Sequence, residues 1–134
     1  GHDISPEENQ IQSGLTFTIS NRKEIDFIGK EALKIIKTKK IDKRFIMLTL
    51  KDSKPGKPLL LHDEPIYFKD KIIGRTTSCN YSFNFKKNLA FGYISNVYST
   101  DELLGNNIFV EVEKQKYQAQ LIEKPLKQSN FKNI

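Results

Sequence analysis

The stretch RTTSCNYSFNFKKNLAFGYIS, residues 75–95, decides the fold of this 134-residue chain. It starts directly after Gly74, alternates aromatic with polar side chains, passes through two lysines, and continues as an apolar run that contains Gly92. A period of two is typical of a β-strand, because successive side chains point to opposite faces of a sheet. The stretch therefore predicts two neighbouring strands and a turn, with the aromatic residues on the core face. Its glycines predict sites where strands bend or approach closely.

Short segments with a strand-like pattern lie on both sides of this stretch. Residues 45–50 are apolar at both alternating sets of positions, which predicts a strand buried on both sides. Residues 64–74 and residues 108–122 each predict a hairpin with a polar loop of three residues. Six or more short strands separated by turns indicate a small antiparallel barrel or a sandwich.

The N-terminal part of the chain has a different pattern. Residues 15–19 alternate apolar and polar side chains and predict a short strand. Gly29 precedes residues 30–39, in which apolar side chains recur at helical spacing, so one helix is expected there. The chain is thus predicted to be mainly β, with an N-terminal strand and one helix.

Composition limits the possible functions. The net charge is +6, but lysines gather at the end of the predicted helix and are otherwise mixed with acidic residues, so no basic stripe indicates nucleic-acid binding. No apolar run reaches the roughly 18 residues of a membrane span, and the polar N-terminal residues contain no signal-peptide core. The single cysteine excludes an internal disulfide framework, which favours a cytoplasmic or organellar protein.

Candidate catalytic residues are few. Cys79 lacks a nearby base in the sequence, and a thiol without one is mostly protonated at neutral pH. The two histidines, His2 and His62, are distant in sequence and do not complete a zinc shell with that cysteine. The carboxylates at residues 101–102 are adjacent in a predicted loop, where they need not converge. Glycine-rich phosphate loops are absent. We therefore predict neither catalytic nor metal-binding residues in this chain.

The aromatic residues leave one alternative open. Tyr81, Phe83, Phe85 and Tyr93 could stack on nucleic-acid bases. A nucleic-acid-binding barrel would place such aromatics and its lysines on the same exposed face. We favour the core interpretation, since aromatics at period two are expected on the buried face of a sheet.

Four segments together resemble a known family. EPIYFKDKIIGRTTSCNYSFNFKKNLAFGYIS is similar to the C-terminal barrel of the glycine cleavage T-protein (aminomethyltransferase) superfamily, with its Glu-Pro-Ile strand, Thr-Ser turn and Ala-x-Gly-Tyr-Val strand. GHDISPEENQIQSGL, DFIGKEAL and KYQAQLIEKPL resemble further segments of that family, in the same order and spacing. The Thr-Thr-Ser-x-x-Tyr-Ser pattern is most like the folate module of dimethylglycine and sarcosine dehydrogenases. The chain departs from the pattern at Gln10, Gln12, Ser13 and Cys79.

The resemblance implies a Greek-key-like antiparallel β-barrel of about six strands. It implies that residues 1–40 form the end of a preceding folate-binding domain, that residues 41–126 form the barrel, and that residues 127–134 form a tail. The parent protein would transfer a carbon from a methylated amine or aminomethyl substrate to tetrahydrofolate, giving 5,10-methylenetetrahydrofolate. Catalytic residues, and an FAD site if there is one, would precede this chain, which alone would not be catalytic. The location would be cytoplasmic, or the mitochondrial matrix in a eukaryote, with no membrane or nucleic-acid partner.

Two residues are implied as folate contacts. Arg44 aligns with a family arginine, and a guanidinium can bind a glutamyl carboxylate through two hydrogen bonds. Phe131 falls where some T-proteins place a folate-contacting tyrosine. A tRNA-modifying or demethylating relative of the same superfamily would share the barrel, and differs upstream of it.

Overall fold

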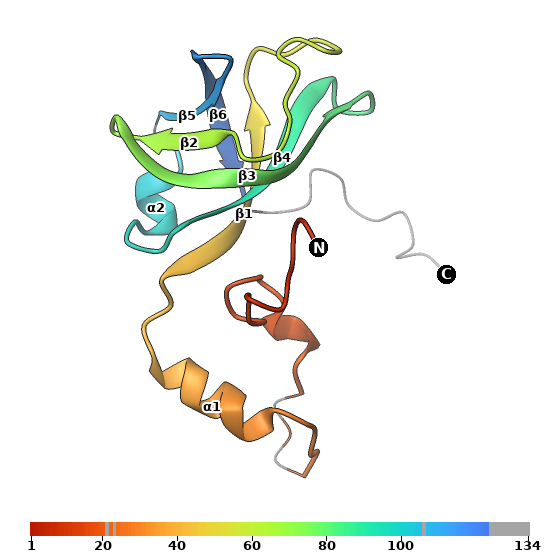
Figure 1. Cartoon of the computed structure of the whole chain (residues 1–134), viewed down its shortest axis with the longest axis vertical. Helices are drawn as coiled ribbons and strands as arrows, with labels where there is room; N and C mark the ends of the chain where they lie inside the picture. Colours follow the sequence, from red (N-terminus) through yellow and green to blue (C-terminus); the bar gives the residue numbers. More distant parts are fainter. Residues whose placement is uncertain (21, 23, 106, 124–134) are drawn as a thin grey trace.

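The computed structural model describes residues 1–20, 22, 24–105 and 107–123. Six antiparallel strands close into a barrel in the order β1-β4-β3-β2-β5-β6 (Figure 1). The strands are β1 (Lys43–Leu50), β2 (Pro65–Phe68), β3 (Lys71–Ser82), β4 (Lys87–Ser95), β5 (Ile108–Val112) and β6 (Gln115–Ile122). Hairpins join β2, β3 and β4, and β1 lies beside β4, which is the Greek-key order. The predicted barrel is confirmed.

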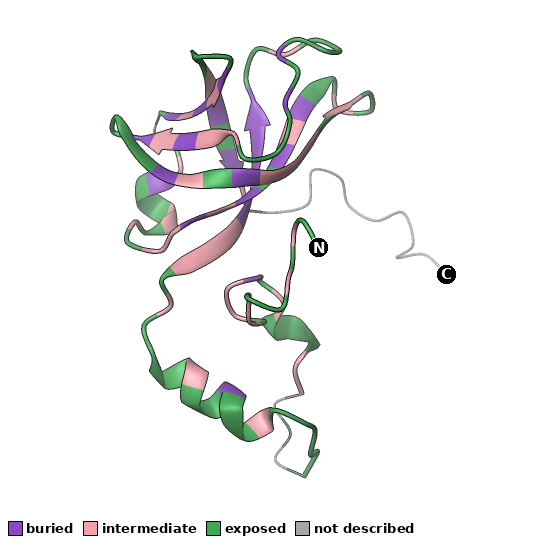
Figure 2. Cartoon of the chain, viewed as in Figure 1, coloured by how far each residue is buried: buried purple, intermediate pink, exposed green. Residues whose placement is uncertain are grey.

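The barrel interior is filled by aliphatic side chains rather than by the aromatic residues of β3 and β4. Phe68 is the largest fully buried side chain in the described part of the chain. Figure 2 shows that most buried residues lie on the barrel strands, whereas α1 is mainly exposed. In β4 the buried positions alternate from Asn88 to Ile94, so Phe91 and Tyr93 point outward. Phe83 follows β3 in a turn and is 75% exposed. The prediction that these aromatics form the core is wrong, because the core cluster of the described residues contains none of them. The interior side of β4 carries Asn88, Ala90, Gly92 and Ile94 instead.

Two glycines allow β3 and β4 to pair. A Cβ on Gly74 would lie 1.9 Å from the carbonyl oxygen of Tyr93, and one on Gly92 would lie 2.4 Å from that of Arg75. The predicted close approach is therefore confirmed. Gly74 lies within β3, which runs without a break from residue 71 to residue 82. The sequence had instead predicted that one strand ends at residue 74 and another follows it.

Both predicted hairpins are present, with tighter turns than expected. Lys69 and Asp70 join β2 to β3, and Glu113 and Lys114 join β5 to β6. All four residues have φ between 49° and 65°. Two successive left-handed residues make the turn whose twist matches that of paired strands, so two residues suffice where three were predicted.

Three short elements lie outside the sheet. The predicted helix is confirmed as α1 (Lys30–Thr38), preceded by Gly29 at φ +90°, and it lies away from the barrel (Figure 1). Residues 15–19 do not form the predicted strand: they contain the 3-10 turn η1 (Thr16–Thr18), in which the Thr18 hydroxyl donates to the Leu15 carbonyl at 2.7 Å. The helix α2 (Thr100–Leu103) was not predicted. None of the helices described is long and apolar enough to cross a membrane.

Candidate functional site

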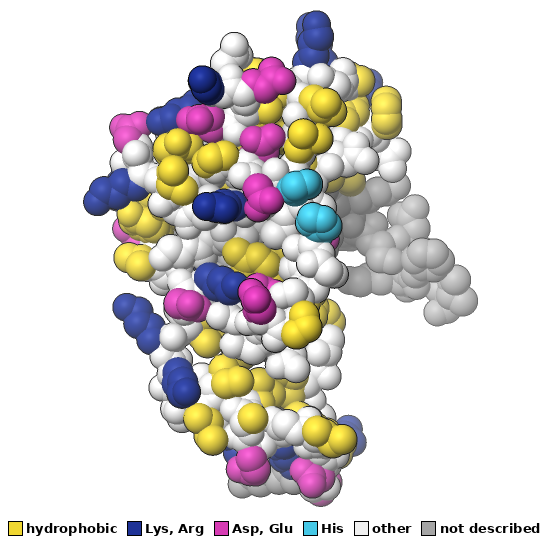
Figure 3. Space-filling view, in the orientation of Figure 1, with side chains coloured by type: hydrophobic (Ala, Val, Ile, Leu, Met, Phe, Trp, Pro, Cys, Tyr) yellow, Lys and Arg dark blue, Asp and Glu magenta, His cyan; other side chains and the backbone are white. Residues whose placement is uncertain are grey.

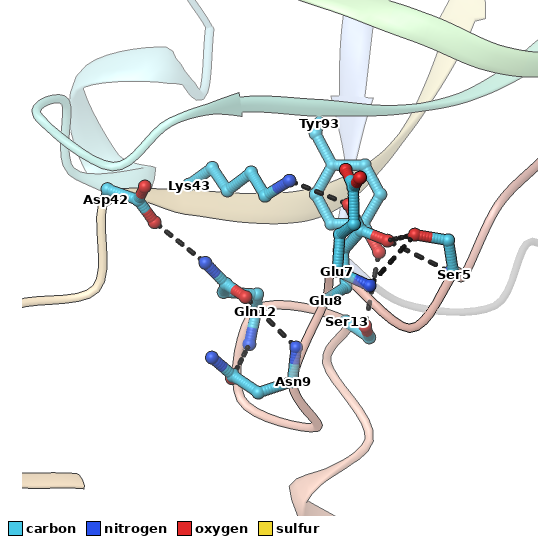
Figure 4. A network of polar contacts seen from close by, with 9 residues as sticks. All are labelled: Ser5, Glu7, Glu8, Asn9, Gln12, Ser13, Asp42, Lys43 and Tyr93. Atoms are coloured by element: carbon cyan, nitrogen blue, oxygen red, sulfur yellow. Dashed lines mark hydrogen bonds and ion pairs between the residues drawn. The ribbon is translucent and has the colours of Figure 1, made fainter. Parts of the chain in front are cut away.

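Residues 1–14, which we call the lead-in, lie against the outer face of β1, β4 and β3. The Phe45 amide donates to the Gln12 carbonyl at 2.7 Å, which ties the lead-in to β1. The hydroxyls of Ser13 and Tyr93 are 3.1 Å apart, which adds a contact to β4 (Figure 4). No local pattern in the sequence predicts that these segments meet, because only their separate resemblance to one family connects them.

The middle of the lead-in forms an ion pair with the first residue of β1. The Lys43 Nζ donates to Glu8 Oε1 at 2.7 Å and lies 5.1 Å from the centroid of the Tyr93 ring. Ser5 donates to the other carboxylate oxygen through its amide and its hydroxyl. The Lys43 ammonium, followed by these Ser5 donors, lowers the pKa of Glu8 from 4.5 to about 2.

This pair predicts a defined acid sensitivity. The pKa of Glu8 is lower in the folded than in the unfolded chain, so the pair stabilises the fold above pH 4.5 and loses this effect as the pH falls toward about 2. Glu8→Gln is expected to lower the melting temperature at pH 7 and to flatten its fall between these pH values. Glu7→Gln, at the exposed neighbouring carboxylate, should leave the profile unchanged. Parallel profiles for the wild type and Glu8→Gln would contradict the assignment.

The Thr-Thr-Ser motif connects three segments. Thr77 Oγ1 donates to Asp3 Oδ1 at 2.5 Å, and the Ser78 hydroxyl donates to the same oxygen. The buried Thr76 hydroxyl accepts the Glu64 amide at 3.0 Å, which fixes the loop before β2. The motif therefore holds the lead-in and the loop before β2 against β3, a role that the sequence did not indicate.

Arg44, the folate contact implied by the resemblance, lies at one end of the barrel. Its Nη1 donates to Thr100 Oγ1 and its Nη2 to the Tyr98 carbonyl, both at 2.9 Å. Its Nε is buried without a hydrogen-bond partner. Within the described ranges Arg44 forms no ion pair with a carboxylate. The guanidinium is thus held by neutral oxygens only.

Arg44 also lines a cavity of about 460 Å³ between the lead-in and β1. Phe45, Phe91 and Thr100 line the same cavity. Phe131, the second implied contact, lies outside the described residues, so its role as a folate contact stays a prediction.

The remaining candidates for catalysis or metal binding are Cys79, His2 and His62. Burial raises the pKa of the Cys79 thiol to about 11, which disfavours a nucleophilic thiolate. His2 and His62 are distant in sequence, yet their ring centroids lie 5.1 Å apart (Figure 3). His62 Nδ1 is 2.9 Å from Asp63 Oδ2. In the part of the chain that the structure describes, no three residues of the types His, Cys, Asp and Glu form a metal-binding group.

The carboxylates at residues 101–102 belong to α2 and not to a loop. Glu102 and Ser99 form a reciprocal capping box: the Glu102 side chain accepts the Ser99 amide at 2.9 Å, and the Ser99 hydroxyl accepts the Glu102 amide at 3.2 Å. The Ser-x-x-Glu spacing in the sequence was the signal for this helix start. Because Arg44 donates to Thr100, the cap also fixes one of the oxygens that hold the guanidinium.

Comparison with known proteins places this geometry in a class. The family described as the glycine cleavage T-protein C-terminal barrel domain matches residues 43–127, and the chain therefore belongs to that family. The match begins at the first residue of β1 and contains all six strands.

Individual relatives agree with this assignment. Mitochondrial dimethylglycine dehydrogenase of Mus musculus is 35% identical over 128 residues, which cover 94% of this chain and 14% of that protein. The aminomethyltransferase of Listeria welshimeri serovar 6b is 30% identical over 125 residues, covering 93% of this chain and 33% of that protein. The crystal structure of the glycine cleavage system aminomethyltransferase T from Bartonella henselae superimposes with a TM-score of 0.73 at 20% identity, covering 90% of this chain and 32% of that one. The chain thus spans a third or less of the length of these proteins.

Proposed function

We propose that this chain is the C-terminal part of a longer tetrahydrofolate-dependent enzyme and helps to close its folate site. The relatives named as dimethylglycine dehydrogenase and aminomethyltransferase support an enzyme of one of these two types. In it, tetrahydrofolate accepts the carbon of a methylated amine or an aminomethyl group and becomes 5,10-methylenetetrahydrofolate. The catalytic residues, and any FAD, belong to the preceding part of the polypeptide. The enzyme would work in the cytoplasm, or in the mitochondrial matrix of a eukaryote.

The observation that carries the proposal is the environment of Arg44. A partly buried cation held only by neutral oxygens lacks the compensation that a buried charge needs. Its Nε is buried and makes no hydrogen bond, although it is one of the five donors of the side chain. A carboxylate at the cavity rim would neutralise the charge and accept from the guanidinium. The glutamyl carboxylates of a folate have this chemistry.

The residues around Arg44 would determine how such a carboxylate is held. Thr100 Oγ1 and the Tyr98 carbonyl fix the two Nη atoms, which sets the plane of the guanidinium. Phe45 and Phe91 are apolar residues that line the same cavity. A carboxylate bound beside them would be less well hydrated, which strengthens its attraction to Arg44.

A binding experiment on the longer protein tests this role. Arg44→Met is expected to weaken tetrahydrofolate binding about tenfold or more, since a charge-assisted hydrogen bond to a carboxylate is lost. Isothermal titration calorimetry would measure this change. Lys51→Met, which removes an equal charge just after β1, should alter the dissociation constant less than about twofold. Equal binding by Arg44→Met and the wild type, with the fold intact by circular dichroism, would refute the proposal.

We also propose that residues 1–40 complete the preceding domain, that residues 41–126 form the barrel, and that residues 127–134 are a tail. The buried cluster of the barrel, as far as the structure describes it, contains no side chain from residues 1–42. In contrast, Ile28 and Ile35, seven residues apart on the segment around α1, are 105% and 58% exposed. Ile28 lies just before α1 and Ile35 within it, so large apolar side chains are exposed around this helix, which indicates a partner surface. A preceding domain would supply it.

A further inference from the structure

We infer that a groove on the outer face of β3 and β4 is the docking surface for the polypeptide that precedes residue 1 in the longer protein. This inference rests on the proposed function only in assuming that a longer protein exists. The groove has a volume of about 400 Å³, and the outward residues that line it include Ser78, Asn80, Leu89 and Phe91. We call it the β3–β4 groove.

The outer face around this groove is unusually rich in aromatic side chains. Outward positions of a small barrel normally carry polar residues. Here Phe45 and Phe91 stack with ring centroids 5.3 Å apart, and Phe45 and Tyr93 lie 5.1 Å apart. These three residues form a continuous apolar strip across β1 and β4. A strip of this kind indicates contact with another protein surface.

The lead-in covers only one end of the strip. Its Ser13 hydroxyl is bonded to Tyr93, and its Gln12 carbonyl accepts the Phe45 amide. Phe91 remains 40% exposed at the other end. Phe91 lines both the cavity beside the lead-in and the β3–β4 groove, so the two hollows share a wall. The uncovered groove thus continues an interface that is already formed within the chain.

The position of residues 1–3 indicates which segment covers the β3–β4 groove. Asp3 accepts hydrogen bonds from Thr77 and Ser78, and Ser78 itself lines the β3–β4 groove. Residues 1–3 are therefore fixed at the edge of the groove, and a polypeptide joined to residue 1 starts beside it. The family is a C-terminal barrel domain, and the matched relatives are at least about three times longer than the matched segment. Most of such a protein precedes the barrel.

The chemistry of the groove favours a protein partner over a nucleic acid. Among the described residues that line the groove, none carries a charge. Nucleic-acid binding depends on cations that neutralise phosphates along the backbone. Apolar and hydroxyl side chains without such cations instead fit the apolar core and neutral polar rim of a protein interface.

Hydroxyl-radical footprinting of the longer protein and of the 134-residue chain tests the inference. Interface burial is expected to lower the oxidation rates of Leu89 and Phe91 at least about threefold in the longer protein. Ile72, on β3 outside the groove and 60% exposed, serves as the internal control and should react within about twofold in both proteins. Equal rates for Leu89 and Phe91 in both proteins would overturn the inference.

Matched variants make the test independent of footprinting. Phe91→Ser is expected to lower the melting temperature of the longer protein several degrees more than that of the 134-residue chain, whereas Ile72→Ser shifts both equally. Equal shifts for Phe91→Ser would also overturn the inference. The inference would likewise be overturned if oxidation of the groove residues in the 134-residue chain fell at high protein concentration. It would also be overturned if a single-stranded oligonucleotide lowered that oxidation.

Both measurements are made without folate, so they separate this inference from the proposed function. Protection of the groove in a protein that fails to bind tetrahydrofolate would refute the function and support the docking surface. Folate binding by a protein with an unprotected groove would support the function and refute the docking surface.

Discussion

Gly74→Ala is expected to destabilise the barrel by about 3 kcal/mol or more, which exceeds the effect of most single substitutions. The added Cβ would lie 1.9 Å from the Tyr93 carbonyl oxygen and 2.8 Å from the Ile94 Cα. Both are backbone atoms of β4, so no side chain can rotate away to make room. The substitution forces β3 and β4 apart where they pair. Urea denaturation followed by circular dichroism would measure the loss.

Gly56→Ala is the matched control for this prediction. Gly56 lies in the connection between β1 and β2 at φ +69°, and a Cβ there meets no atom within 4 Å. Only the left-handed backbone is strained by alanine, which costs about 1 kcal/mol. The comparison therefore separates the close approach of two strands from the general cost of replacing glycine. A Gly74→Ala loss no larger than that of Gly56→Ala would show that β3 and β4 can separate without unfolding the barrel.

The sequence predicted the strands well, because the apolar pattern and the turn residues that mark a strand are local signals. Residues 45–50 and the two hairpins were found from apolar periodicity and turn residues, and the structure contains all of them. The segment of residues 15–19 has the same alternation, yet it forms a 3-10 turn. A strand needs a neighbour to satisfy its backbone groups, and none of the six barrel strands pairs with this segment. Alternation alone could not show that.

The assignment of faces was less predictable than the assignment of strands. A period of two shows that a strand has two different faces, but it does not show which face points into the barrel. In β4 the interior accepts Ala90 and Gly92 because the opposite strands approach closely, so Phe91 and Tyr93 face outward. The aromatic residues were interpreted as core because large apolar side chains are usually buried. The outward position of Tyr93 is explained by the lead-in, whose Ser13 hydroxyl lies against it.

The candidate site was predictable only in part, because it depends on contacts between remote segments. The resemblance to a family pointed to Arg44, and the structure adds its oxygen partners on the segment at residues 98–100. The contacts of Asp3 with Thr77 and of Glu8 with Lys43 span 74 and 35 residues. No local pattern encodes such pairs. They follow from the closure of the barrel, which brings the outer faces of β1, β4 and β3 together beneath the lead-in.

Phe68→Ala is expected to cost about 3 to 5 kcal/mol, the range for removing a phenyl ring from a core. Phe68 is 1% exposed and is the last residue of β2, between β3 and β5. Its ring meets the edge of the Tyr98 ring at a centroid distance of 5.0 Å. The cavity left by alanine would remove this support, and the surrounding strands can collapse into it only partially.

Phe68 therefore links the barrel core to Arg44. The Tyr98 carbonyl accepts from Arg44 Nη2, so the position of Tyr98 influences the guanidinium. Phe68→Leu, which keeps most of the volume, should cost less than Phe68→Ala and preserve the Arg44 geometry. Phe83→Ala is the control for a 75% exposed phenylalanine and should change the free energy of unfolding by about 0.5 kcal/mol or less. If urea denaturation gave the same loss in free energy of unfolding for Phe68→Ala as for Phe83→Ala, the barrel core would not depend on the Phe68 ring. The position of Tyr98 would then be set by the contacts of its own segment.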